Sequence, residues 1–179
     1  MKSLIKIFIS INAAILLSAC SSLPYDRESL LPMVSEVSKF SPDEVLFLAE
    51  ANFAISPPDK TCAKFKRGAY VQTSDNILVY EYNRESQRLQ QFHKISISDL
   101  DYVGIHSAGI GGFVNQLRFV DSRAWLTVAI TRQKDIVAGS KKDITPAIDA
   151  LEKNNIKVNK GAPVVTNNAA CNFILYIPS

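Results

Sequence analysis

A period-two alternation of apolar and polar residues dominates the middle of the chain. This pattern predicts β-strands that bury one face, and turn-forming residues such as Ser74-Asp75-Asn76 separate the strands. The strongest segment is ILVYEYN, residues 77–83, because it is rich in β-branched and aromatic residues. The predicted strands span residues 64–73, 77–83, 89–97, 102–106, 113–120 and 124–131.

The last two of these strands are expected to form a hairpin across Asp121-Ser122. In the second strand of the hairpin, Leu126, Val128 and Ile130 share one face, and Trp125 lies on the other. A glycine-rich turn, residues 108–112, precedes the hairpin. A further strand is predicted near the end of the sequence, at residues 172–177.

Two segments carry signals for helices. Residues 42–54 follow Ser41 as an N-cap, have Pro42 at the first helical position, and place apolar residues at helical spacing. The second helix runs from Thr145, with Pro146 in its first turn, to Asn154. Consecutive antiparallel strands followed by a helix predict an α+β fold.

The order of the segments ILVYEYN, KISISDLDYVGI, NQLRFV, AWLTVAI and DITPAIDALEKN resembles that of a bacterial pleckstrin-homology-like (PH-like, GRAM-like) domain. The resemblance covers about residues 64–158 of the chain. It implies a strongly bent antiparallel sheet or partly open barrel whose C-terminal helix closes one end. The helix at residues 42–54 would be an extra N-terminal element. Such folds are mostly binding modules, although a fold alone does not establish a function.

The N-terminal segment has the order of a secretion signal. Lys2 and Lys6 precede an apolar run at residues 7–17, which is too short to span a bilayer comfortably. The sequence Leu17-Ser18-Ala19-Cys20 resembles the lipobox of bacterial lipoproteins. The resemblance implies cleavage between Ala19 and Cys20, with lipidation (diacylglycerol and an acyl chain such as palmitate) at Cys20. The alternative is an ordinary secreted protein with a cysteine near its cleavage site.

The lipobox also implies a location and a division of the chain. Ser21, rather than aspartate, follows Cys20, and this favours an outer-membrane lipoprotein that faces the periplasm. The expected parts are a signal peptide at 1–19, a lipidated tether at 20–40 and one domain at 41–179.

The charge of the chain argues against nucleic acid as a partner. The 179 residues carry a formal charge of +3, and loss of Lys2 and Lys6 with the signal would leave 18 basic and 17 acidic side chains. A nearly neutral chain lacks the positive charge by which proteins bind the phosphate backbone.

The lipobox changes how the three cysteines are counted. With Cys20 lipidated, Cys62 and Cys171 remain, and a lipid-anchored protein of the envelope lies in an oxidising compartment. We therefore expect a Cys62–Cys171 disulfide. The alternatives are two buried free thiols or a metal site completed by histidine.

Candidate sites for chemistry are few. His93 and His106 could bind a metal together with Asp99 or Asp101, but they lack metal-ligand spacing, and two ordinary histidines are the favoured interpretation. The sequence has no G-x-S-x-G motif, and the glycines at 109–112 lack the Lys-Ser/Thr of a phosphate loop.

The one basic cluster consists of Lys60, Lys64, Lys66 and Arg67. It could contact an anion such as a lipid head group or a lipopolysaccharide phosphate, although a solvated strand face is the simpler interpretation.

These patterns favour a membrane-tethered, non-enzymatic interaction module with no cofactor and no metal. We expect it to dock an envelope protein through a sheet edge or an exposed aromatic residue such as Trp125. The alternative function is a carrier or sensor that binds a lipid or a glycan, for example lipopolysaccharide.

Overall fold

A computed structural model of the chain describes residues 23–24, 26–56, 64–108, 114–133, 136–137 and 144–160. Seven strands follow one path through an antiparallel sheet, in the order β4-β3-β2-β1-β7-β6-β5, and a short β8 pairs with β7. The strands are β1 Phe47–Ser56, β2 Lys66–Gln72, β3 Asn76–Asn83, β4 Arg88–Ser96, β5 Leu100–Ala108, β6 Val114–Asp121, β7 Trp125–Gln133 and β8 Ile136–Val137. The helices are α2 Arg27–Val37 and α3 Thr145–Lys153, with short 3-10 turns at Pro42–Glu44 and Ile97–Asp99.

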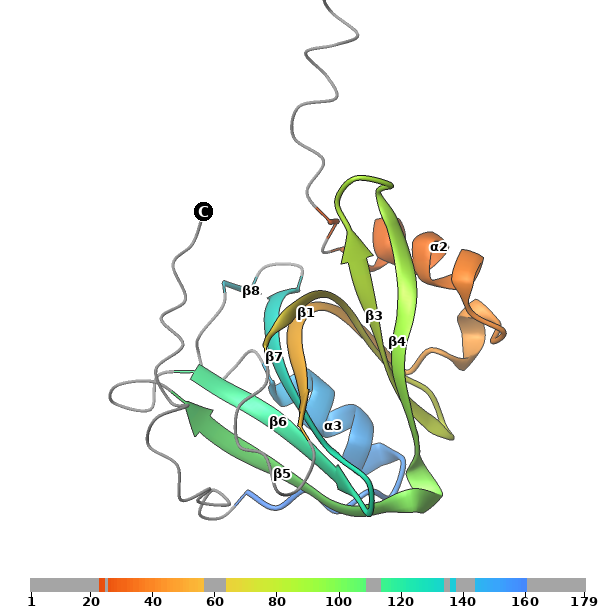
Figure 1. Cartoon of the computed structure of the whole chain (residues 1–179). Helices are drawn as coiled ribbons and strands as arrows, with labels where there is room; N and C mark the ends of the chain where they lie inside the picture. The colour runs from red at the N-terminus through yellow and green to blue at the C-terminus, as the bar shows by residue number, and fades with distance from the viewer. Residues whose placement is uncertain are drawn as a thin grey trace, which may run out of the picture.

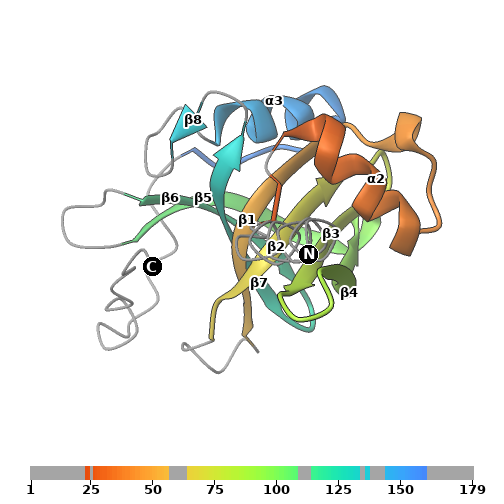
Figure 2. The ribbon, with the colours of Figure 1, turned by 90° about the horizontal axis from the view of Figure 1, so that it is seen from above.

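The sheet is strongly bent but does not close into a barrel. Its central strand β1 pairs with both β2 and β7, whereas β4 and β5, although consecutive in sequence, end the two sides of the sheet without pairing. The sheet curves around α3, and α2 lies outside the curve beside β3 and β4 (Figures 1 and 2). The predicted α+β class, with a bent antiparallel sheet and a closing C-terminal helix, is confirmed. This architecture is the one that the PH-like resemblance implies.

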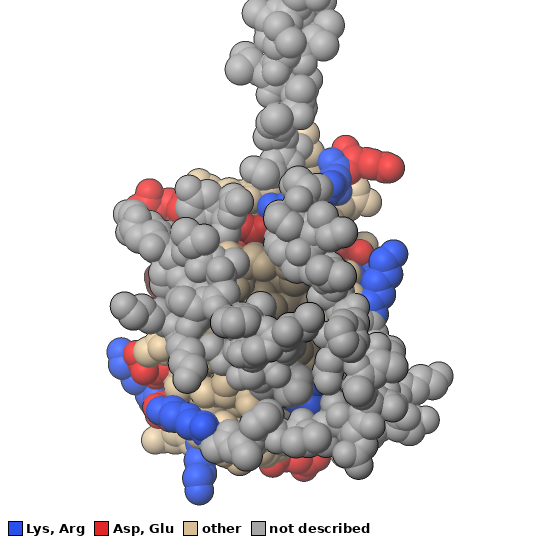
Figure 3. Space-filling model, turned by 90° about the vertical axis from the view of Figure 1, so that its left-hand side faces the viewer, with Lys and Arg blue, Asp and Glu red and all other residues tan. Residues whose placement is uncertain are grey.

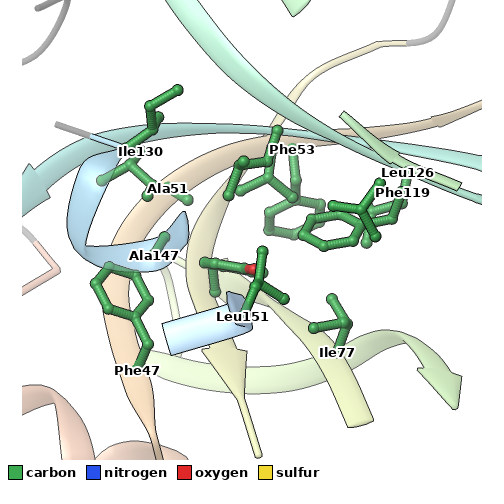
Figure 4. Close-up of a cluster of buried hydrophobic side chains, with 14 of the residues drawn as sticks. Phe47, Ala51, Phe53, Ile77, Phe119, Leu126, Ile130, Ala147 and Leu151 are labelled. Atoms are coloured by element: carbon green, nitrogen blue, oxygen red, sulfur yellow. The ribbon is translucent and has the colours of Figure 1, made fainter. Parts of the chain in front are cut away.

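The inner face of the sheet and α3 enclose the larger core. Phe119 and Tyr70 lie at its centre with ring centroids 5.8 Å apart, and Leu151 of α3 packs among them (Figure 4). A polar contact joins the helix to the sheet, since Gln72 Nε2 donates to the carbonyl oxygen of Ala147 at 3.1 Å. Burial of this apolar surface is the main stabilising contribution.

A second core lies between α2 and the outer face of β1–β4. Leu30 and Val34 of α2 are fully buried there and pack with side chains such as Leu48 and Tyr80. The helix begins after Asp26, whose carboxylate accepts from the backbone N–H of Ser29 at 2.8 Å, as expected of an N-cap. This half of the sheet is therefore covered on both faces.

Tyr80 in this second core predicts a loss of stability at alkaline pH. Burial raises the pKa of Tyr80 from 10.0 to about 12, and the neighbouring Ser38 hydroxyl moderates the rise. Neither hydroxyl oxygen has a partner within normal hydrogen-bond geometry. Because the folded-state pKa is the higher one, this contribution to stability is intact below pH 10 and is lost as the pH rises toward 12.

The free energy of unfolding should therefore fall less steeply between pH 10 and 12 in Tyr80→Phe than in the wild type. At neutral pH the substitution should change stability little, because it removes a buried hydroxyl that has no partner. Urea unfolding at several pH values measures both effects. Equal slopes in the two proteins would contradict the assignment.

The predicted helix at residues 42–54 is wrong. The capping signals are present, since the backbone N–H of Ser41 donates to the Glu44 carboxylate, but they begin only the 3-10 turn Pro42–Glu44. From Phe47 onward the chain is the central strand β1. The N-terminal helix of the fold is α2, which lies in the segment assigned to the tether.

The other predicted elements agree with the structure where it describes them. The strands at 64–73, 77–83, 89–97, 102–106, 113–120 and 124–131 correspond to β2–β7, and the helix beginning at Thr145 is α3. The hairpin of β6 and β7 is confirmed, and Leu126, Val128 and Ile130 share the inner core. The strand at 172–177 and the glycine turn at 109–112 lie outside the described residues. Within the described ranges, no helix is long and apolar enough to span a bilayer.

Candidate interaction site

The two edges of the sheet differ in their backbone partners. At the β5 edge, Asn159 forms a parallel bridge with Gly104, donating to the carbonyl of Val103 at 2.8 Å and accepting from the N–H of Ile105 at 3.1 Å. At the other edge, β4 pairs with β3 on one side and has no strand on its other side among the described residues. Most β4 side chains are exposed. Edges of this kind are templates for pairing with another chain.

A β-bulge shapes the β4 edge. Val79 lies opposite His93 and Tyr80 lies opposite Gln91, so that Phe92 is the extra residue on β4. Bulges bend an edge strand and redirect a side chain. The Phe92 side chain is 38% exposed, and few other large apolar side chains among the described residues are exposed.

Phe92 is held in place by its neighbours. Its ring packs on Phe53 with the ring centroids 5.5 Å apart, and Lys66 Nζ lies 4.4 Å from the Phe92 ring centroid. Lys66 is also ion-paired with Glu81 of β3. A cation over an aromatic face stabilises it by roughly 0.5–1 kcal/mol at an exposed position. We define the Phe92 surface as Phe92, Lys66 and Glu81 with the exposed β4 residue Gln90, which lies opposite Glu81.

His93 lies beside this surface but shows no sign of a metal site. Burial lowers its pKa, a nearby Asp121 carboxylate opposes the shift, and Arg123 adds to it. Its Nε2 is buried and has no hydrogen-bond partner. In the part of the chain that the structure describes, no three His, Cys, Asp or Glu side chains gather as a metal site would require. The His106 side chain lies outside this part.

Two members of the predicted basic cluster, Lys66 and Arg67, lie on opposite faces of β2, because they are consecutive on this strand. Lys66 pairs with Glu81, and Arg67 Nε lies 2.6 Å from the Oε1 atom of Glu50. Lys64 is exposed, and Lys60 lies outside the described residues. Described basic and acidic side chains are also interleaved around the face shown in Figure 3. Anion contact by Lys60, Lys64, Lys66 and Arg67 stays a prediction.

The remaining predicted residues have separate outcomes. Ala19, Cys20, Cys62 and Cys171 lie outside the described residues, so the lipidation, the cleavage and the disulfide stay predictions. Trp125 is half-buried, and the Arg118 guanidinium carbon lies 5.4 Å from its ring centroid.

Another surface feature lies at the far end of the inner core. An open hollow of about 410 Å³ lies between the start of β1 and α3. Its lining includes Leu46, Pro146, Asp149 and Lys153. Leu46 is 47% exposed. The lining residues of the hollow include no paired nucleophile and base. Its exposed apolar side chain, Leu46, belongs to the segment before β1 and not to β4, so it serves as a comparison for Phe92.

The role of Phe92 was missed in the sequence. Leu89 and Ile95 have the same parity, so a regular strand would place them on one face, yet Leu89 lies in the outer core and Ile95 in the inner core. The bulge at Phe92 moves the two residues to different faces. The sequence signal for the bulge is that Phe92, an aromatic residue, has the opposite parity to Leu89 and Ile95 on either side of it.

Comparison with known proteins adds little to these observations. No protein-family model matches the chain, and none of the curated proteins matches it. Among solved structures, one of the Vav1 exchange factor, concerning its PH and C1 domains, has a TM-score of 0.47 and 4% identity, covering 71% of this chain and 31% of that one. A structure of Vav1 with an allosteric inhibitor has a TM-score of 0.47 and 5% identity, covering 72% and 22%. The chain thus spans less than a third of each Vav1 chain, and no functional property is carried over from them.

Proposed function

We propose that this protein is a lipid-anchored lipoprotein of the bacterial envelope, in the outer membrane and facing the periplasm, whose folded part is a non-catalytic protein-interaction module. The module docks an extended segment of an envelope protein along β4. The observation that carries this proposal is the β4 edge, which lacks a second strand among the described residues and presents Phe92 at a bulge.

The physics of strand addition fits this edge. An added strand gains backbone hydrogen bonds along β4, and its alternate side chains supply specificity. Phe92 offers a rigid aromatic anchor of the kind that dominates binding energies, and exposed Gln90 offers polar contacts beside it. Because Lys66 and Arg67 are each paired with a carboxylate, a protein segment suits the surface better than an anionic head group does.

The lipobox resemblance supports the anchor at Cys20. The fold limits the length of free chain between the lipid and the domain. Leu23 is 1% exposed and belongs to the outer core, so only residues 21 and 22 separate it from Cys20. Three residue steps of extended chain span about 10 Å. A lipid on Cys20 would therefore hold the domain close to the membrane surface, with less free chain than a tether over all of residues 20–40 would give.

Site-specific photo-crosslinking in the bacterium tests the docking. A photoreactive residue replaces Gln90 in the full-length, lipidated protein, and the matched control carries it at Asp149 of α3, which is also exposed. We expect one defined envelope protein to be joined to the Gln90 position and not to the Asp149 position. Equal labelling from both positions, or none from Gln90, would contradict the proposal.

The same cells distinguish the alternative function. A carrier or sensor would co-purify with a lipid or a glycan in stoichiometric amount, which mass spectrometry of the purified protein detects. The docking proposal predicts no such molecule.

A further inference from the structure

Strand β4 carries positive charge and no negative charge. Arg88 and Lys94 lie near its two ends, both side chains are exposed, and neither Asp nor Glu occurs on the strand. Other described basic residues are ion-paired with a carboxylate, namely Lys66, Arg67, Arg123 and Lys160. Neither Arg88 nor Lys94 has such a partner in the described part of the chain. The β4 edge of the sheet therefore offers two cations that are free to pair with an incoming chain (Figure 1).

The register places the two cations at opposite ends and on opposite faces of this edge. Arg88 lies opposite Asn83 of β3, and Lys94 lies opposite Leu78. Because Asn83 and Leu78 are five residue steps apart, they point to opposite faces and are separated by about 17 Å along the strand. The bulge places Phe92 between the two cations. An added strand of about six residues would reach from one cation to the other across Phe92.

The same charges disfavour pairing between the β4 strands of two copies of this chain. Gln91 is the midpoint between the two cations, and an antiparallel pairing centred on it would bring Arg88 of one copy opposite Lys94 of the other. Like charges directly opposite each other destabilise a strand pair, and basic side chains on an edge strand are a common protection against self-association. A strand that carries carboxylates at these positions would gain attraction instead of repulsion.

An acidic peptide segment also fits this edge better than an anionic membrane surface does. The edge presents the backbone N–H and C=O groups of β4 as well as the two cations. An extended peptide supplies donors and acceptors at the spacing of a strand, whereas a layer of lipid head groups does not. The peptide therefore satisfies both the backbone and the charges.

We propose that the segment docked along β4 is acidic: one carboxylate pairs with Arg88, a second pairs with Lys94, and an apolar side chain between them packs on Phe92. This inference rests on the proposed docking at β4 and adds the chemistry of the partner. Charged pairs at the rim of an interface accelerate association and select partners more than they raise affinity. Phe92 thus supplies the apolar contact, and the two cations decide which segments are accepted and in which register.

Charge reversal on β4 tests the proposal in the full-length, lipidated protein, with the photoreactive residue at position 90. The variant Arg88→Glu/Lys94→Glu is compared with Lys153→Glu/Lys157→Glu, which makes the same change in net charge at exposed lysines in and after α3. We expect the β4 reversal to reduce the yield of the partner crosslink about fivefold or more, and the control to keep the wild-type yield. A full yield from the β4 reversal would overturn the acidic segment but leave docking at β4 in place. No crosslink in the wild type would overturn both.

A neutral variant covers the case in which charge reversal disturbs the fold. Arg88→Gln/Lys94→Gln removes the attraction without adding repulsion, so we expect it to reduce the crosslink yield about twofold or more. Circular dichroism and protein levels establish that the variants are folded. A wild-type yield from the folded neutral variant would count against the two ion pairs.

The crosslinked product also identifies the docked segment by mass spectrometry. We expect it to contain Asp or Glu on both sides of an apolar residue. Changing these two carboxylates to lysine in the partner should restore the crosslink to Arg88→Glu/Lys94→Glu to within about twofold of the wild-type yield, because each pair is then reversed as a whole. A segment without acidic residues, a crosslink to a lipid or to a second copy of this chain, or a failure of the exchanged charges to restore the yield would overturn the proposal.

Discussion

Gly68→Ala should destabilise the protein by about 3 kcal/mol or more, because the new methyl group has no space in the sheet. Gly68 lies in β2 opposite Glu81 of β3. A Cβ atom at Gly68 would lie 1.7 Å from the carbonyl oxygen of Tyr80 and 2.8 Å from its carbonyl carbon. These are backbone atoms of the neighbouring strand, so relief requires β2 and β3 to separate. Urea unfolding of the wild type and the variant measures the difference.

Gly104→Ala is the matched control. Its Cβ atom would also collide, but with the far end of the Tyr102 ring at 2.1 Å, and a side chain of this kind can rotate away. We expect a loss of about 1 kcal/mol, well below that of Gly68→Ala. Equal losses, or a Gly68→Ala protein as stable as the wild type, would show that β2 and β3 do not pair in this register.

Phe119→Ala should cost about 3–5 kcal/mol, because it removes a ring from the centre of the inner core. Phe119 is fully buried, and its ring packs on Tyr70. The sheet is built around this position and cannot collapse readily into the space that the ring leaves. Urea unfolding at neutral pH, with a free energy extrapolated to zero denaturant, gives the loss.

Phe92→Ala provides the comparison with the same change in side chain. Because Phe92 is 38% exposed, its ring loses less apolar contact on truncation, and we expect a cost of about 1 kcal/mol. The two variants together separate the core from the Phe92 surface. Similar losses in both would contradict the placement of one ring inside the fold and the other at its edge.

The sequence predicted most of the sheet but not its central strand. Strands β2–β7 bury one face more than the other or carry strong β-formers. Their alternation of apolar and polar residues could therefore be recognised in the sequence. Strand β1 is buried on both faces, with Phe53 in the inner core and Leu48 in the outer core. Such a strand has no clear alternation, and the capping signals at Ser41 favoured a helix. Tertiary pairing with β2 and β7 decided its conformation.

The helix α2 was hidden for a related reason. Pro32 lies inside α2, which begins at Arg27. Proline usually interrupts a helix, so its position argued for a later start. The burial of Leu30 and Val34 against the outer face of the sheet compensates, and no pattern within the segment alone reveals that surface.

The candidate site was less predictable than the fold. Adjacent basic residues suggested one charged surface, but strand geometry sends Lys66 and Arg67 to opposite sides of β2. Phe92 gained its exposure from a bulge, and a bulge depends on the register between β3 and β4. Register is a property of two strands together, so single-strand patterns did not locate it.

The central claim is that the protein docks its partner through the Phe92 surface. The most direct test repeats the in-cell crosslinking from position 90 in three backgrounds: wild type, Phe92→Ser and Leu46→Ser. Leu46 is a second exposed apolar residue, and it lies at the hollow beside α3 rather than at β4.

We expect Phe92→Ser to reduce the yield of the partner crosslink about tenfold or more, as loss of a binding hot spot does, while Leu46→Ser keeps the wild-type yield. Equal protein levels and circular dichroism spectra establish that all three proteins are folded. A full yield from Phe92→Ser, or a loss confined to Leu46→Ser, would contradict the assignment of the docking surface to β4.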